Sequence, residues 1–259
     1  MKKIYLLLLV LFVSQLNAQE NSFSDDGRTI KIPVIIHLLK LNNGKSIKDS
    51  QIIQELKELN SNFTAKNNMS SLNEDFKNLV GNPNFEFYLA DTTLNNSSLK
   101  GIIRYSSISN ISNNLNINPE KYLNIFIGNN KTSSNVLQER KLPKNIKINY
   151  TKIGNKSNTI THEIGHYFGL WHVWGSGNCS RFKNPFRQKT DEISDTPKQK
   201  NCTDVKRINQ CPPRKVKKTP NYNNFMDYSS CRCFFTIGQA SKMREKVIKY
   251  RNHVYQNSK

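Results

Sequence analysis

The chain has 259 residues, of which 39 are Lys or Arg and 19 are Asp or Glu, giving a formal charge of +20 at pH 7. This length is sufficient for one domain with a sizeable core and does not require a second one. The basic excess gathers in residues 181–218 and after residue 242, but these segments carry no groove-reading motif and no stripe of interleaved aromatic residues. We therefore expect no nucleic-acid partner, and infer from the charge only an attraction to acidic substrates or surfaces.

Residues 1–18 have the order of a secretory signal peptide: two lysines, an apolar run over residues 4–13, and small Ala18 where cleavage is expected. Such a run spans about 15 Å as a helix, roughly half of a bilayer core, so it does not predict a membrane anchor. A buried strand or helix is the alternative. The sequence predicts an exported protein without a membrane span, in which a short segment, 19–29, precedes a single domain, 30–259.

Apolar patterns in the first half of the domain predict strands and a helix. Residues 29–39 are rich in β-formers, with a Pro33 that suits an edge or a strand start, and His37 there is expected to be a core or sheet histidine. Residues 46–63 have apolar side chains at helical spacing, which predicts an amphipathic helix packed on a sheet. The last predicted strands are the alternating segments 85–89 and 123–127.

Asn- and Ser-rich residues 92–100 and 106–120 predict loops. A helix is predicted from residue 157 to 168, an irregular region covers 173–225, and a helix from 237 to 254 closes the chain. This order of elements predicts an α+β domain.

The closing helix has two local signals of its own. Thr236 and Gln239 have the spacing of a capping box, which satisfies backbone N–H groups at a helix start. An apolar stripe should then face the core. Its members are Met243, Val247, Tyr250 and Val254.

The strongest chemical signal in the chain is a group of histidines. His162 and His166 are four residues apart, so on a helix both imidazoles project from one face and can share a metal. Glu163 lies beside the first histidine, where its carboxylate can reach a metal-bound water. Gly169 can adopt the positive φ that ends the helix, and that turn would bring His172 back as a third ligand. Three nitrogen ligands leave a position open for water, which is typical of catalytic zinc.

These residue types suit peptide hydrolysis. Zinc lowers the pKa of its water from about 15.7 towards about 7. Glu163 can then accept the proton of the attacking water and pass it to the leaving nitrogen, while the metal takes up charge on the carbonyl oxygen. The alternative, a core helix with satisfied histidines, is disfavoured because three of the chain's five histidines lie at the required offsets.

The pattern His-Glu-x-x-His-x-x-Gly-x-x-His resembles the metzincin signature. Metzincins also need a methionine turn beneath the metal, and residues 224–228 resemble one. With residues 195–197 and with Cys231 leading into residues 235–239, the chain is similar to the pappalysin family over about residues 30–245. The resemblance implies a metzincin-type catalytic domain, with a twisted mixed sheet, a zinc-binding helix, a C-terminal helix, and a loop-rich lower half stapled by disulfides.

The resemblance also implies roles for further residues. Met226 would form the hydrophobic floor under the zinc without binding it. Tyr228 would point its hydroxyl near the metal and help to stabilise the tetrahedral intermediate, with core packing as the alternative. Asp191 and Thr196, with the carbonyl of Ser194, match part of a structural calcium site, although solvated loop acids are the other interpretation.

All five cysteines lie in the last third of the chain, which in an exported protein suggests disulfides that staple long loops. Their odd number leaves many pairings open. The resemblance implies that Cys179 and Cys233 are additional to the family's usual set, and that a bridge links the 202–211 loop to the methionine-turn region. The residues of the usual set are Cys202, Cys211 and Cys231.

Residues and resemblance together predict a secreted, zinc-dependent endopeptidase acting on protein or peptide substrates. One alternative is a catalytically weak or inactive metzincin-fold protein that binds polyanionic surfaces through its basic loops; the intact Glu163 and ligand set disfavour it. Relatives that cut beside basic residues would need an acid in the pocket wall next to the methionine turn, but here the turn is followed by Ser229, Ser230, Cys231 and Arg232. We therefore expect no strong preference for Arg or Lys after the scissile bond. Asp25 and Asp26 are expected to be a solvated end, with transient coverage of the metal as the alternative.

Overall fold

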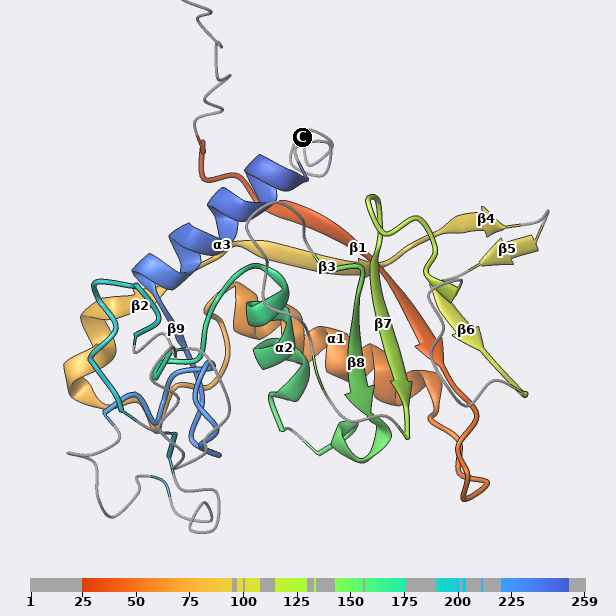
Figure 1. The fold of residues 1–259 in the computed structure, drawn as a ribbon, viewed down its shortest axis with the longest axis horizontal. Helices are drawn as coiled ribbons and strands as arrows, with labels where there is room; N and C mark the ends of the chain where they lie inside the picture. Colours follow the sequence, from red (N-terminus) through yellow and green to blue (C-terminus); the bar gives the residue numbers. More distant parts are fainter. Residues whose placement is uncertain are drawn as a thin grey trace, which may run out of the picture.

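The computed structural model places a central sheet and, in the described residues, three α-helices (Figure 1). The expected signal peptide 1–18, Cys179 and Val254 lie outside the described part of the chain. The residues that the structure describes are 25–94, 97–99, 101–107, 115–129, 133, 143–155, 157–175, 190–200, 202–203, 211 and 220–251.

A five-stranded sheet forms the centre of the fold. The middle strand is β1. On one edge of β1, β3 pairs with its first half and β6 with its second half. On the other edge β7 pairs with β1, and β8 pairs with the outer edge of β7. These pairings are all parallel, and an antiparallel bridge between Ser133 and Lys147 adds to β8. Within the described residues the sheet is therefore mostly parallel. Its strands are β1 (Ile30–Leu38), β3 (Phe85–Leu89), β6 (Ile102–Arg104), β7 (Leu123–Gly128) and β8 (Asn145–Asn149).

β1 is buried at every position except Lys31, as expected for a parallel strand covered on both faces. Pro33 lies inside this central strand, although its sequence favours an edge or a strand start. The backbone groups of Ile30 and Val34 bond toward β3, so the nitrogen of Pro33 faces the opposite side. β7 pairs with β1 only from Val34 onward, so at Pro33 the strand is locally an edge and no ladder hydrogen bond is lost.

One face of the sheet packs against α1 (Asp49–Phe63), α2 (Thr159–Tyr167) and α3 (Ile237–Tyr250). All three helices that the sequence predicts are present, each slightly shorter than predicted. Alternate residues of β1 point into this layer, because side chains alternate between the two faces of a strand. The core includes Ile30, Ile32, Val34, Ile36, Leu38, Ile52, Leu59, Phe63, Ile160, Ile164, Met243 and Val247.

His37 is a buried sheet histidine, as the sequence predicts. Its Nε2 donates to Oδ1 of Asn124 at 2.8 Å, and its Nδ1 accepts from the hydroxyl of Tyr105 at 3.0 Å. Its ring stacks on Phe126, with centroids 4.1 Å apart. Burial lowers the pKa of His37 to about 4, so this imidazole is neutral at pH 7 and belongs to the packing of the sheet.

The prediction of a loop over residues 92–100 is wrong, because an antiparallel pair of short strands forms there. Asn and Ser dominate the average composition of residues 92–100. The β-branched and apolar residues towards the two ends of this segment nevertheless suffice for strands of three residues. The described part of residues 106–120 contains no strand and no α-helix. The elements not predicted from residue patterns are β2 (Val80–Gly81), β4 (Thr92–Leu94), β5 (Ser97–Leu99), β6, β8, β9 (Phe235–Thr236), and the 3-10 helices η1 (Glu74–Leu79) and η3 (Tyr150–Lys152).

The start of α3 is capped twice. The predicted capping box is present: Thr236 Oγ1 accepts from the N–H of Gln239, and the amide oxygen of Gln239 accepts from the N–H of Thr236. Asp195 adds a second cap, accepting from the hydroxyl of Thr236 at 2.7 Å and from the N–H of Gly238 at 2.8 Å. A carboxylate at a helix N-terminus is also favoured by the helix dipole. The segment around residue 195 is thereby tied to the C-terminal helix.

Asp25 is exposed, as expected from the sequence, but it is also held in an ion pair. Its carboxylate pairs with Arg244 of α3 at 2.5 Å, across 219 positions in the sequence. The same guanidinium donates to the carbonyl groups of Pro83 and Arg28 at 2.8 and 2.9 Å. Arg244 holds the pKa of Asp25 below its ordinary value. The side chain of Arg244 in α3 therefore holds the segments that lead into β1 and into β3.

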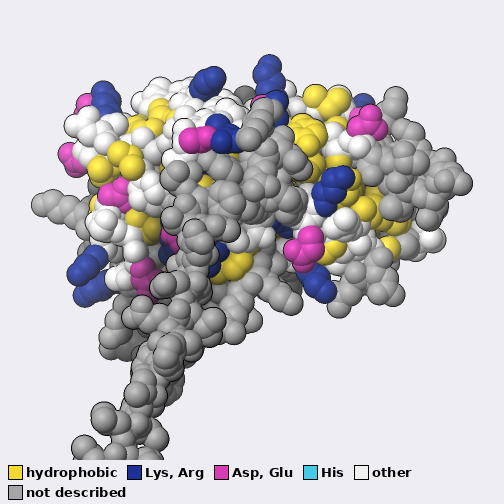
Figure 2. All heavy atoms as spheres, turned by 90° about the horizontal axis from the view of Figure 1, so that it is seen from above, with side chains coloured by type: hydrophobic (Ala, Val, Ile, Leu, Met, Phe, Trp, Pro, Cys, Tyr) yellow, Lys and Arg dark blue, Asp and Glu magenta, His cyan; other side chains and the backbone are white. Residues whose placement is uncertain are grey.

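On the face shown in Figure 2, the described Lys and Arg side chains are interspersed with Asp and Glu and do not form one continuous basic patch. Most of the basic segment 181–218 lies outside the described residues. Every helix in the described part of the chain is too short or too polar to cross a membrane.

Candidate active site

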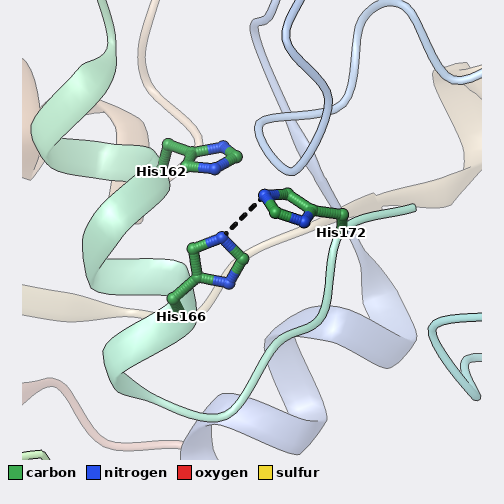
Figure 3. A group of neighbouring side chains, drawn as sticks. All are labelled: His162, His166 and His172. Carbon is green, nitrogen blue, oxygen red and sulfur yellow. Dashed lines mark hydrogen bonds between the residues drawn. The ribbon is translucent and has the colours of Figure 1, made fainter. Parts of the chain in front are cut away.

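The zinc-binding pattern lies on α2 and on the turn that ends it (Figure 3). Gly169 has a φ of 90°, as its place in the sequence predicts. Its N–H bonds to the carbonyl of His166 at 2.9 Å, and the N–H of Leu170 bonds to the carbonyl of Gly165 at 2.9 Å. This pair of bonds is a Schellman motif, which stops the helix and reverses the chain.

The reversal brings His172 back to the two histidines of α2. Nε2 of His172 lies 3.0 Å from Nε2 of His166, and one nitrogen from each of the three imidazoles lies within 4.8 Å of the others. His162 and His166 come from one helix face, and His172 approaches from the chain that follows (Figure 3). The structure therefore brings together all three histidines of the predicted ligand set.

The nitrogen donors fit a zinc ion. Nδ1 of His162 donates to the carbonyl of Phe225 at 2.7 Å, and Nδ1 of His166 donates to the carbonyl of Leu170 at 2.8 Å. Because a carbonyl only accepts, the proton sits on Nδ1 and the lone pair of Nε2 is free for a metal. Tetrahedral zinc bonded to two imidazoles separates their nitrogens by about 3.3 Å, close to the spacing of His166 and His172.

Burial also keeps these imidazoles neutral, which metal binding requires. It lowers the pKa of His166 to about 4. The pKa of His162 falls well below 6.5, first through burial and then through the neighbouring His166, His172 and Arg232. At pH 7 no proton therefore competes with a metal for Nε2 of either residue.

Glu163 and Tyr228 lie beside the histidines. Glu163 is 8% exposed and follows His162 on α2. The ring of Tyr228 lies 5.5 Å from the ring of His162 and 5.0 Å from that of His172. Burial raises the pKa of Tyr228, and the negative charge of Glu163 raises it further. The phenol is therefore protonated at neutral pH and can donate a hydrogen bond.

Met226 lies fully buried under α2, in the methionine turn. The turn is closed by a hydrogen bond from the N–H of Asp227 to the carbonyl of Asn224, and Asn224 Oδ1 accepts from the N–H of Met226 at 2.9 Å. A Cβ added at Gly165 would lie 2.4 Å from Sδ of Met226. Gly165, which no sequence pattern singles out, therefore lets the sulfur lie directly against the zinc helix.

Asp227 is a second residue whose importance sequence reasoning misses. It is fully buried, and its carboxylate accepts from the N–H of Tyr228 at 2.7 Å and from the N–H of Thr203 at 3.1 Å. The hydroxyl of Thr203 also donates to it. Asp227 therefore joins the methionine turn to a segment more than twenty residues earlier. Only its position beside Met226 could have indicated this role.

The cysteines strengthen the same region. Cys211 and Cys231 form a disulfide, which is the expected bridge between the 202–211 loop and the methionine-turn region. Cys202 is also disulfide-bonded. Cys233 is free and buried, and burial raises the pKa of its thiol to about 11.

The proposed calcium residues lie in the segment that caps α3. Asp191 and Thr196 are 3% and 6% exposed. Oδ2 of Asp191 and Oγ1 of Thr196 are both buried without a well-formed hydrogen bond among the described residues, although the Thr196 side chain is near enough to lower the pKa of Asp191. Burial raises the pKa of Asp191 to about 6. Unpartnered buried oxygens of this kind are rare in folded proteins and need an explanation.

A mostly parallel sheet, a zinc-type histidine helix, a Schellman turn to a third histidine and a methionine turn define a metzincin metallopeptidase. A family model described as Pregnancy-associated plasma protein-A, peptidase family M43, matches residues 107–248. The chain belongs to this family, the pappalysins, and is a metalloendopeptidase.

Similar proteins extend this result over most of the chain. An extracellular metalloprotease of Arthroderma gypseum is 27% identical over 245 residues, which cover 88% of this chain and 76% of that protein. One from Aspergillus oryzae is 38% identical over 97 residues, which cover 35% of this chain and 27% of that protein.

Two solved structures of mirolysin are similar as well. Mirolysin in complex with compound 9 has a TM-score of 0.67 at 29% identity, with 89% of this chain and 96% of that chain covered. Mature mirolysin of Tannerella forsythia in complex with a cleaved peptide has a TM-score of 0.62 at 27% identity, with 87% and 98% covered.

Proposed function

We propose that this chain is a secreted endopeptidase in which His162, His166 and His172 hold zinc and Glu163 moves the proton during peptide-bond hydrolysis. The observation that carries the proposal is the set of three imidazole nitrogens within 4.8 Å of one another, two of them on imidazoles whose other nitrogen is bound to a backbone carbonyl. The complex of mature mirolysin with a cleaved peptide supports peptides as the substrate class.

Zinc, when bound, supplies a Lewis acid and lowers the pKa of coordinated water. Glu163 accepts the proton of the attacking water and then donates it to the leaving amine nitrogen. Tyr228, whose pKa is raised, donates its hydroxyl hydrogen to the carbonyl oxygen as negative charge develops there. Met226 packs beneath the histidines as an apolar floor and contributes no ligand.

The central test is the variant Glu163→Gln, which keeps the shape of the side chain and removes the base. We expect stoichiometric zinc by metal analysis and a loss of casein hydrolysis of at least about 100-fold, as expected for a general base. Glu86→Gln is the matched control, because Glu86 is an exposed residue of β3. Full activity of Glu163→Gln would remove this residue from the mechanism.

Export is part of the proposal. The extracellular metalloproteases among the relatives support it, together with the signal-peptide pattern of residues 1–18. The catalytic unit is then the single domain 30–259. N-terminal sequencing of the protein recovered from culture medium tests this, with Gln19 expected as the first residue. Exported protein that still begins with Met1 would contradict the proposal.

Calcium is a further proposed cofactor. The unpartnered oxygens of Asp191 and Thr196 lie in a buried segment, and a hard cation with oxygen ligands would satisfy both. Asp195 in the same segment is already engaged in capping α3. A calcium ion here would stabilise that cap and not take part in hydrolysis.

The alternative of an inactive protein that binds polyanionic surfaces has less support. The ligand set and Glu163 are intact, and these are the residues that an inactive relative is free to lose. Casein zymography with and without chelator separates the two. A cleared zone in the casein gel that disappears when chelator is added would support the peptidase.

A further inference from the structure

Arg232 spans the gap between the two segments that carry the reacting side chains. Its Nη1 donates to the carbonyl of Asp227 in the methionine turn at 3.3 Å, and its Nη2 donates to the carbonyl of Ser157 before α2 at 2.5 Å. In return, Nδ2 of Asn158 donates to the carbonyl of Arg232 at 3.0 Å. The guanidinium is therefore fixed between the methionine turn, which carries Tyr228, and the chain just before α2, the helix that carries Glu163.

The charge of this guanidinium is not neutralised by an ion pair within the described residues. Both of its hydrogen bonds go to uncharged carbonyl groups, and its Nε is buried with no acceptor. The carboxylate of Asp227 already accepts from Thr203 and from the N–H of Tyr228. Burial lowers the pKa of Arg232 to about 10, so the side chain remains charged at pH 7.

By contrast, several other arginines of the described chain have a carboxylate partner. Arg28 pairs with Asp26, and Arg104 pairs with Asp49. A cation that is partly buried, held by neutral groups and left without a counter-ion is costly unless an anion completes it. Among the described residues no carboxylate pairs directly with Arg232, although the negative charges of Asp227 and Glu163 raise its pKa, so a ligand carboxylate is the available partner for the guanidinium.

The reacting groups lie within electrostatic range of this cation. The guanidinium binds the carbonyl of Asp227, and the ring of the next residue, Tyr228, lies 5.5 Å from that of His162 and 5.0 Å from that of His172. A peptide whose carbonyl group lies between Glu163 and Tyr228 would bring a side chain that flanks the scissile bond towards the guanidinium.

We propose that Arg232 is a specificity-determining residue that makes this enzyme prefer peptides with Asp or Glu next to the scissile bond. The inference rests on the proposed function. A guanidinium forms strong, charge-assisted hydrogen bonds with a carboxylate and repels Lys or Arg at the same place. Acidic peptides are therefore the substrate class.

The test compares kcat/KM for three peptides that differ only at one position, which carries Glu, Gln or Lys. The series is made once for each of the two positions flanking the scissile bond. At one of them we expect the Glu peptide to be cleaved about tenfold more efficiently than the Gln peptide, with the Lys peptide slowest. The preference should shrink as ionic strength rises. Hydrolysis of the Gln peptides tests the proposed function separately, since no charge is involved.

The variant Arg232→Gln should lose the preference while it still cleaves the Gln peptide within a few-fold of wild type. Arg104→Gln, which removes the same charge from β6, should keep the preference. Arg232→Lys retains the charge and should keep part of the preference for the Glu peptide. It provides a second test if Arg232→Gln does not fold. Equal rates for Glu and Gln peptides at both positions in the wild type would overturn the proposal. So would an equal loss for all three peptides in a folded, zinc-containing Arg232→Gln, because that pattern belongs to a structural clamp.

Discussion

The indole ring of Trp174 stacks on the imidazole ring of His172, with centroids 4.4 Å apart and planes inclined by 10°. Trp174 is fully buried, and its ring also meets that of Tyr228 edge-on at 4.9 Å. The N–H of Gly175 bonds to the carbonyl of His172 at 2.7 Å, which closes the turn that carries both rings. The third histidine thus comes from a loop, but the indole fixes its plane.

Removal of this stacking should weaken zinc binding. We expect Trp174→Ala to lower zinc affinity by about 10- to 100-fold, the range found when groups that orient metal ligands are lost. Trp174→Phe keeps an aromatic face against His172 and should retain most of the affinity. Competition with a chromogenic chelator measures both variants. Equal affinity in wild type and Trp174→Ala would show that the turn alone positions His172.

The contact between Gly165 and Met226 predicts a stability effect. Gly165→Ala places a methyl group against the sulfur, so the free energy of unfolding should fall by about 1–3 kcal/mol, as for other overpacked cores. Met226→Ala leaves a cavity and should also be destabilising. The double variant should be more stable than the sum of the two effects predicts, because the methyl fills part of that cavity. Urea unfolding of all four proteins tests this, and simple additivity would contradict it.

His37 predicts a pH dependence of stability. Its pKa is about 4 in the folded protein and about 6.5 when unfolded, so between these values the unfolded chain binds more protons. The free energy of unfolding should therefore be at its full value above pH 6.5 and fall as the pH drops towards 4, by up to about 3 kcal/mol from this residue.

The variant His37→Gln isolates this effect, because the zinc histidines titrate equally in both proteins. Urea unfolding of metal-free wild type and His37→Gln at pH 7 and pH 4.5 gives the comparison. The wild type should lose more stability than the variant between the two. An equal loss would show that His37 is protonated in the folded state without cost.

Calcium should raise the melting temperature if it fills the site at Asp191 and Thr196. Free calcium at about 100 times its Kd adds about 2.7 kcal/mol to the free energy of unfolding. Thermal unfolding at constant zinc, with calcium titrated in, measures the shift. Asp191→Ala should no longer respond, whereas the exposed Asp26→Ala should respond like wild type. A calcium effect that survives in Asp191→Ala would place the ion elsewhere.

The parts of the site that sequence alone predicts are local in the chain. His162, His166 and His172 lie within eleven residues, so helical periodicity and one glycine turn are enough to bring them together. The roles of Asp227 and Arg232 depend on partners at residues 203 and 157, and no spacing rule connects such distant segments.

In the fold too, the elements defined by local sequence are predicted, and those that depend on distant segments are not. The amphipathic pattern of α1 and the capping box of α3 give correct helices, since both are read within a few turns. Pro33 indicates an edge, but whether β1 has a neighbour there depends on where β7 begins. The hairpin of β4 and β5 escapes prediction because short strands contribute little to an average over a loop-like segment.

The ion pair between Asp25 and Arg244 joins residues 219 positions apart in the sequence. The ribosome synthesises the central strand β1 early, yet the side chain that anchors the start of this strand belongs to α3, near the C-terminal end. Contacts of such long sequence separation form late, because a large loop must close before they stabilise anything. Loss of the final helix, by proteolysis or by a premature stop, would therefore loosen the opposite end of the polypeptide.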